Sequence, residues 1–229
     1  WRINSIMAVI NNHSSINLDS TFQSNHTELL QFFYNEGLDV EINHDFAGLR
    51  TLLLSKEKDD YPYDFDPAFE SELNNATGFV LYLKLSGNVV ATYAAKKLMY
   101  GTFVEGMKAK FDGTYENIDL PASLEEAYSS CQWVSKDHRG KRWGRALDHL
   151  KKDIVFDILK CDLNYAIHKE AYKDYHTEHL SYNISEKIAL IPNGDVGGAG
   201  EVIDKVYNIA YITTTQWTAK QSEIKSLYS

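Results

Sequence analysis

The sequence predicts an α/β fold in which a mixed, mostly antiparallel central sheet is flanked by helices. Three observations predict it: helical patterns near the N-terminus, a change to period-two strands near the middle, and a C-terminal half in which strands and helices alternate. The chain has 229 residues, 44% of them hydrophobic and 24% charged, which is enough for one substantial core. Its apolar runs fall short of the roughly 18 residues that a membrane helix needs, so we expect no membrane partner.

The N-terminal region divides into an arm and a first helix. Residues 1–24 are rich in Asn and Ser and lack a period, so we expect an irregular arm followed by a single domain over 25–229. Asn25 as N-cap, with Glu28 three residues later, is typical of a capping box, and Gly37 can end the helix.

Two further helices and a hairpin follow. A helix is expected over 45–55, and a short one after Asp66, because Asp followed by Pro67 is a good N-cap and first-turn pair. Alternating apolar residues over 79–85 and 89–95 lie on either side of a Ser-Gly-Asn turn, which indicates a β-hairpin.

The second half alternates strands with helices. Residues 100–124 have no clear period and are expected to leave the sheet. The elements expected after them are a strand at 127–134, a helix from about Gly144, a strand at 162–168, a helix at 170–181, and strands at 185–191 and 206–215.

Net charge, cysteine content and histidine spacing limit the partners, the cellular location and the metal sites that we expect. The net charge of −9 opposes binding to nucleic acid phosphates. Cys131 and Cys161 are too few for a disulfide framework, so we expect free buried thiols and a cytoplasmic, reducing location. His176 and His179 have no third ligand at a diagnostic spacing, so we expect a solvated pair and no metal.

One segment concentrates positive charge. Between Lys136 and Lys152 there are seven cations and two carboxylates, or 7 − 2 = +5, in a chain of −9. This segment contains the start of a helix, where free backbone N–H groups and the helix dipole favour an anion. We interpret residues 138–147, HRGKRWGRAL, as a diphosphate-binding turn whose glycines permit close backbone approach. The alternative is a solvated basic helix face with purely conformational glycines.

The run from Val134 to Leu147 resembles the acyl-CoA binding motif of the GNAT superfamily of N-acyltransferases. The order of elements from 25 to 215 also resembles the GNAT fold, and residues 168–175, HKEAYKDY, match a second family pattern at Ala171 and Tyr175, with His168 in place of Asn. In the motif, Arg142 stands where the family usually has glycine, and Lys136 stands where it often has proline. The matching motif residues are Arg139, Gly140, Gly144, Ala146 and Leu147.

The resemblance implies an N-acetyltransferase that moves an acetyl group from acetyl-CoA to a primary amine by direct attack in a ternary complex, without a metal. By this resemblance, backbone groups of one strand end would bind pantetheine, and the turn would bind diphosphate, with the Arg142 side chain as an extra cation beside the phosphates. The cofactor-binding residues expected are Trp133, Val134, Arg139, Gly140, Lys141, Arg142, Trp143, Gly144 and Arg145.

Two catalytic residues are expected. The resemblance assigns Tyr175 as the general acid that protonates the departing thiolate, with Tyr172 and Tyr182 as neighbouring rivals. Strand alternation predicts that Glu126 shares one face with four other residues and could act as the base; the alternative is that it only caps or solvates the start of the strand. The four are Tyr128, Ser130, Gln132 and Val134.

Other functions remain open at this point. A catalytically silent acyl-CoA-binding or regulatory module would have the same fold, and an ordinary anion-binding interaction domain would share the basic turn. We expect no acyl-Cys131 intermediate, because its sequence neighbours do not clearly activate the thiol. The acceptor can be a small-molecule or peptide amine, and a homodimer is compatible with the sequence.

Overall fold

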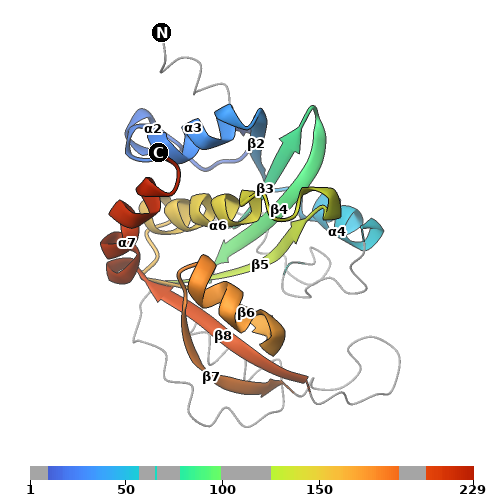
Figure 1. The fold of residues 1–229 in the computed structure, drawn as a ribbon, viewed down its shortest axis with the longest axis vertical. Helices are drawn as coiled ribbons and strands as arrows, with labels where there is room; N and C mark the ends of the chain where they lie inside the picture. The colour runs from blue at the N-terminus through green and yellow to red at the C-terminus, as the bar shows by residue number, and fades with distance from the viewer. Residues whose placement is uncertain (1–9, 57–64, 66–77, 99–124, 191–204) are drawn as a thin grey trace.

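A computed structural model describes residues 10–56, 65, 78–98, 125–190 and 205–229 (Figure 1). The described strands form one sheet in the order β1-β2-β3-β4-β5-β6-β8-β7. Their bounds are β1 Ile10–Asn12, β2 Leu38–Asn43, β3 Gly78–Leu85, β4 Asn88–Lys97, β5 Glu126–Val134, β6 Leu163–Lys169, β7 Asn183–Leu190 and β8 Lys205–Thr213.

The sheet is mixed but mostly antiparallel, which confirms the predicted fold class. Among the described strands, only β1 with β2 and β5 with β6 run parallel. The β5–β6 pairing is short, since it joins Glu126–Ser129 to Leu163–Ala166 and then stops. Beyond Ser129, β5 continues for five residues without a partner strand on that side. The two central strands therefore part in the middle of the sheet.

The helices cover both faces of the sheet. Helix α6 (Trp143–Asp153) continues as a π-helical turn over Ile154–Ile158. It shares the larger core with α2 (Ser20–Asn25), α3 (Thr27–Asn35) and α7 (Thr214–Ser226), whereas α4 (Phe46–Ser55) belongs to a second core on the opposite face (Figure 1). Among the described residues, no helix has the length and apolar character needed to cross a membrane.

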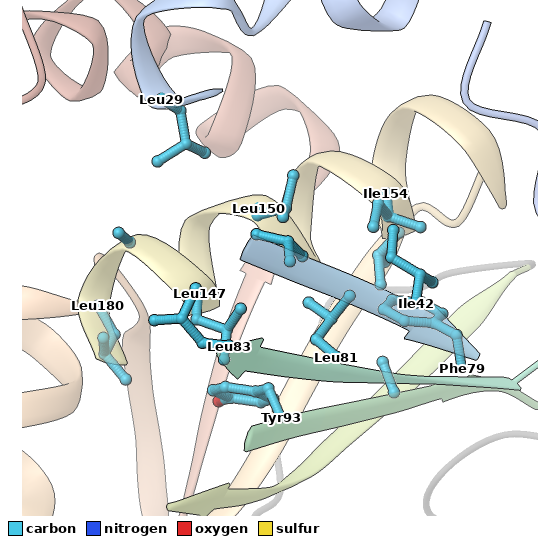
Figure 2. Close-up of a cluster of buried hydrophobic side chains, with 14 of the residues drawn as sticks. Leu29, Ile42, Phe79, Leu81, Leu83, Tyr93, Leu147, Leu150, Ile154 and Leu180 are labelled. Atoms are coloured by element: carbon cyan, nitrogen blue, oxygen red, sulfur yellow. The ribbon is translucent and has the colours of Figure 1, made fainter. Parts of the chain in front are cut away.

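The apolar face of α6 fixes this helix against the sheet. Figure 2 shows Leu147, Leu150 and Ile154 directed at side chains of β2, β3 and β4, including Leu81 and Tyr93. Leu147 and Leu150 of α6 and Ile154 of the π-helical turn recur at the spacing of one helical face and are fully buried. This packing holds the first turn of α6 at the end of β5, and that junction is where the chemistry predicted from sequence is concentrated.

Several predicted elements are confirmed. The hairpin turn has Ser86 and Gly87 at φ 50° and 81°, as a tight two-residue turn requires. Helix α4 begins after Asp45, whose side chain accepts a hydrogen bond from the Gly48 backbone N–H. Gly37, at φ 68°, follows the end of α3. The short helix predicted from Pro67, and residues 100–124, lie outside the described residues.

Two predictions near the N-terminus are wrong in detail, and one helix near the C-terminus was missed. The irregular arm predicted for 1–24 includes strand β1 and most of α2, which is capped by Asp19 and buries Phe22. The next helix starts at Thr27 rather than at Asn25. Helix α7 was not predicted at all, although Thr213 and Gln216 form a capping box whose spacing is visible in the sequence.

An ion pair centred on the buried His26 attaches the N-terminal helices to α6 and its π-helical turn. The His26 ring nitrogens lie 3.0 Å and 2.8 Å from carboxylate oxygens of Asp153 and Asp157. Burial alone would lower the pKa of His26, but the hydrogen bonds and charges of the two carboxylates raise it to about 9. The protonated imidazole is therefore the form that joins these helices at neutral pH.

We expect this ion pair to make stability depend on pH. Because the folded pKa lies above the unfolded value of 6.5, the stabilisation is complete below pH 6.5 and is lost as the pH rises through 9. The difference in unfolding free energy between wild type and His26→Gln should be about 2–3 kcal/mol smaller at about pH 9.5 than near pH 6. Urea unfolding of both proteins at both pH values measures this difference in free energy. His13→Gln, at an exposed position, is the control, and an equal difference at both pH values would contradict the assignment.

Candidate functional site

The turn between β5 and α6 exposes the start of a long helix. A short 3₁₀ turn (Lys136–His138) follows β5, Gly140 takes φ 83°, and Arg142 is the N-cap of α6 at φ 65° and ψ 2°. The N-cap makes no side-chain hydrogen bond, and the first turn holds no acidic residue. The first backbone N–H groups of α6 therefore lack the usual capping partner, which suits an anion.

Arg142 takes the left-handed conformation that the family usually gives to glycine at this position. Its Nη1 donates a hydrogen bond of 3.2 Å to the Leu227 carbonyl oxygen, and its guanidinium lies 5.7 Å from the centre of the Phe32 ring. The side chain is thus bound to the end of α7 and to α3. One hydrogen bond from Nη1 directs the guanidinium to these elements, and the backbone turn is preserved. The role of Arg142 as an extra cation beside the phosphates stays a prediction.

Replacing Arg142 tests the cost of this conformation. An L-residue in the left-handed region costs about 1–2 kcal/mol that glycine avoids. Arg142→Gly and Arg142→Ala lose the same contacts, but only alanine keeps the strained backbone. We expect Arg142→Gly to be more stable than Arg142→Ala by about 1 kcal/mol in urea unfolding. Equal stabilities, or a more stable alanine variant, would contradict this reading of the turn.

The side chains of the predicted turn divide into buried and exposed groups. Trp143 is buried, and its Nε1 donates to a Glu36 carboxylate oxygen at 3.0 Å, so its side chain secures α6 to α3. Lys141 lies over the Trp143 ring at 4.7 Å and is exposed. Arg139 donates from Nε to the Val134 carbonyl oxygen at 3.2 Å. Because its side chain is bound to α3, Trp143 can meet an anion only through its backbone.

The cationic segment is smaller than its sequence indicates. Lys151 and Lys152, counted in the local charge of +5, are fully buried on α6 and face the core. The cations that remain at the turn are Lys136, Arg139, Lys141, Arg142 and Arg145. A signal for this burial is present in the sequence, because Lys151 falls four residues after Leu147 on the apolar side of α6.

The two buried lysines share one carboxylate, that of Asp148. Lys152 bonds an Asp148 carboxylate oxygen and the Leu180 carbonyl oxygen, and Lys151 Nζ lies 3.2 Å from the other Asp148 oxygen. Lys151 also donates to Asn164 Oδ1 at 2.7 Å and to the Tyr182 hydroxyl at 2.6 Å. The network joins α6 to β6 and to the segment that follows Tyr175.

Tyr175 lies at the start of α6. Its hydroxyl is 3.4 Å from Nε2 of Gln132, the same nitrogen that lies 3.4 Å from the Gly144 carbonyl oxygen. A Cβ added to Gly144 would lie 2.8 Å from Val134 Cγ2, so glycine permits this close approach of helix to strand. Sequence reasoning placed Gln132 on this strand but gave it no role.

The Tyr175 phenol is protonated at neutral pH. Burial raises the pKa of Tyr175 to about 12, and the Asp148 carboxylate acts in the same direction. The Gln132 hydrogen bond and the Arg145 charge lower it. The Tyr175 hydroxyl therefore carries a proton at neutral pH.

The predicted single face of β5 is wrong. Cys131 has φ 62°, and the β4–β5 register shifts between Thr92 and Ala94, so a bulge interrupts the alternation. Tyr128 packs in the core on the α4 side of the sheet, whereas Gln132 and Val134 contact α6 and its core.

Glu126 is not brought to Tyr175. Its position before the bulge places it on the Tyr128 face by alternation, and it is buried at the start of β5, where β5 pairs with β6. Six residues separate it from Gln132, or roughly 20 Å along a strand. The structure therefore places the Tyr175 phenol at the α6 junction and Glu126 at the other end of β5.

The neighbouring candidates occupy different environments. Tyr172 is 55% exposed, whereas Tyr182 is buried in the lysine network, so neither lies at the α6 junction. His176 is buried with its ring stacked on His168 at 4.0 Å, which corrects the expectation of a solvated His176–His179 pair. Cys131 is 1% exposed within an apolar core, which argues against its acting as a nucleophile.

The fold is that of known N-acetyltransferases. A spermidine N-acetyltransferase mutant from Vibrio cholerae matches with a TM-score of 0.51 at 14% identity, covering 80% of this chain and 98% of that one. A polyamine N-acetyltransferase of Drosophila melanogaster matches at 0.50 and 16% identity, covering 76% and 100%. An aminoglycoside acetyltransferase in complex with coenzyme A matches at 0.52 and 10% identity, covering 80% and 99%. No family model and no curated protein matches the sequence.

These similarities, at identities of 10–16%, establish the fold. The chain has the GNAT N-acyltransferase fold, and the resemblance first seen in residues 134–147 is confirmed at this level. In this chain, β5 parts from β6 beside the start of α6.

Proposed function

We propose that the protein is an acyl-CoA-dependent N-acetyltransferase that moves an acetyl group from acetyl-CoA to a primary amine. One observation carries the proposal: the parted end of β5, the uncapped start of α6 and the Tyr175 hydroxyl meet at a single junction. An anion site and a proton donor side by side suit a substrate with a diphosphate and a thioester.

The donor would be bound mainly by backbone groups. The N–H groups between Arg139 and Arg145 would hold the diphosphate, with Lys141 as an exposed cation beside them. Backbone groups of Trp133 and Val134, on the part of β5 that has no partner strand toward β6, would bind the pantetheine. Binding through the backbone explains how the turn tolerates Arg142, because its main chain keeps the glycine-like conformation.

The chemistry is a direct transfer in a ternary complex. An alkylamine with a reference pKa of about 10.4 must lose a proton before attack; because Glu126 lies at the other end of β5, we assign that proton to solvent water. The amine nitrogen then bonds to the thioester carbon while a β5 backbone N–H stabilises the developing oxyanion. The C–S bond breaks with its electron pair going to sulfur, and Tyr175 protonates the thiolate.

The acceptor we propose is a small cationic amine. The structural neighbours include enzymes whose names give spermidine, polyamines and aminoglycosides as substrates. The net charge of −9 attracts such cations and speeds their encounter with the protein. The two cysteines, both buried and neither in a disulfide, support a cytoplasmic location for the reaction.

An amine panel tests the proposal. Spermidine, agmatine, an aminoglycoside and a short peptide with a free N-terminus are each incubated with acetyl-CoA, and thiol release and acetylated product are measured, alongside calorimetric titration of CoA. We expect CoA binding and turnover with at least one small amine. Tight CoA binding without turnover of any amine would instead support the silent acyl-CoA-binding module. Absence of CoA binding would overturn both and favour an anion-binding interaction domain.

A further inference from the structure

Gln132 reaches the α6 junction only because of the bulge in β5. Tyr128 faces the α4 side of the sheet, and uninterrupted alternation would turn Gln132 to that side as well. The residue at φ 62°, Cys131, reverses the alternation, so the Gln132 side chain lies instead between Gly144 of α6 and Tyr175. A strained backbone position thus brings one amide to the proton donor.

The hydrogen bonds of this amide determine the direction of the Tyr175 hydroxyl. The Gly144 carbonyl can only accept, so the group that faces it must be the NH₂ of Gln132 and not its oxygen. The same nitrogen lies 3.4 Å from the Tyr175 oxygen, and an NH₂ group has two hydrogens, one for each partner. The Tyr175 oxygen therefore accepts from Gln132, which leaves its own hydrogen free to be donated elsewhere.

We propose that Gln132 is a positioning residue that orients Tyr175 to donate its proton to the CoA thiolate. The inference rests on the proposed function. As the C–S bond breaks, sulfur receives the electron pair and takes the phenol proton; the Tyr175 phenolate is stabilised by the Gln132 N–H and by the nearby Arg145 charge, and water returns a proton to it after product release. Gln132 itself exchanges no proton.

Two substitutions of similar size separate orientation from packing. Gln132→Leu fills the space without a hydrogen bond. Gln132→Glu places a carboxylate that can only accept, so it draws the Tyr175 hydrogen toward itself and opposes the Gly144 carbonyl. We expect kcat to fall about 10-fold in Gln132→Leu and further in Gln132→Glu, with KM for acetyl-CoA within about twofold of wild type. Ser130→Ala, on the same strand, is the matched control and should keep the wild-type kcat.

A titration that needs no turnover supplies the second measurement. Incorporation of 3,5-difluorotyrosine at position 175 brings the phenol ionisation into an accessible pH range, where ¹⁹F NMR follows it. A hydrogen bond donated to the phenolate favours the ionised form, so Gln132→Leu should raise the measured pKa by about 0.5–1 unit and Gln132→Glu by more. The Ser130→Ala background should leave it unchanged.

The outcomes are distinct. An unchanged pKa in Gln132→Leu, or a raised KM for acetyl-CoA at constant kcat, would overturn the inference, because Gln132 would then only support the start of α6. If the wild-type protein acetylates no amine while the ¹⁹F titration shows the predicted shift, the proposed function fails and the coupling between Gln132 and Tyr175 is retained.

Discussion

Replacing Tyr175 by Phe is expected to lower kcat for acetyl transfer by roughly 10²- to 10⁴-fold, the range typical for loss of a general acid. The change removes one hydroxyl, which lies at the junction of β5 and α6, and leaves the ring to pack against the core as before. Because binding of the donor is assigned to backbone groups, the dissociation constant for CoA should stay within about threefold of wild type. Steady-state kinetics with the amine that is turned over, together with calorimetry, measures both quantities.

Tyr172→Phe is the matched control for this experiment. Tyr172 lies three residues earlier in the same segment and is exposed, so its variant should keep the wild-type kcat. A Tyr175→Phe enzyme that retains more than half of the wild-type kcat would show that the thiolate leaves without this proton. Equal losses of kcat in both variants would indicate that turnover depends on the packing of this segment and not on the Tyr175 hydroxyl.

Replacing Asp148 by Asn is expected to destabilise the fold by about 3–5 kcal/mol near pH 7, because it leaves two buried lysines without their shared carboxylate. Burial lowers the pKa of Lys151 to about 7 and that of Lys152 to about 8 even with Asp148 present, while the two cations hold the pKa of Asp148 well below its usual range. Urea unfolding monitored by tryptophan fluorescence gives the free energy of unfolding.

The loss in free energy of unfolding caused by Asp148→Asn should become smaller as the pH rises toward 9.5. Above their folded pKa values both lysines are neutral in either protein, so the missing carboxylate no longer leaves a charge unpaired. Asp137→Asn, an exposed position before α6, is the control and should change stability by less than about 0.5 kcal/mol. A deficit that is constant with pH, or one below about 1 kcal/mol, would contradict the ionised network.

Features that depend on neighbouring residues were predictable from sequence. The hairpin followed from alternation on both sides of a Ser-Gly-Asn turn, and the helix expected over 45–55 is found as α4. The apolar stripe through Leu147, Leu150 and Ile154 placed α6 correctly. The capping box at Thr213 belongs to the same class of signal and would have located α7.

The site was predictable in its backbone but not in its side chains. A turn into a helix was expected at residues 138–147 and is found before α6, whereas the binding role of this turn and the catalytic role of Tyr175 stay predictions. The roles of Arg142 and Gln132 were not predictable. The Arg142 guanidinium binds the end of α7, 85 residues away in sequence, and Gln132 owes its direction to the bulge at Cys131.

Local spacing determined the strands, the helices and the helix start that presents backbone N–H groups, because each depends on residues only a few positions apart. The assignment of Tyr175 to proton donation came from the family resemblance and not from spacing. Tertiary structure decided which charges are buried and which face of β5 meets α6. Lys151 and Lys152 count as surface cations until the core closes over them, and the alternation of a strand holds only until packing introduces an extra residue.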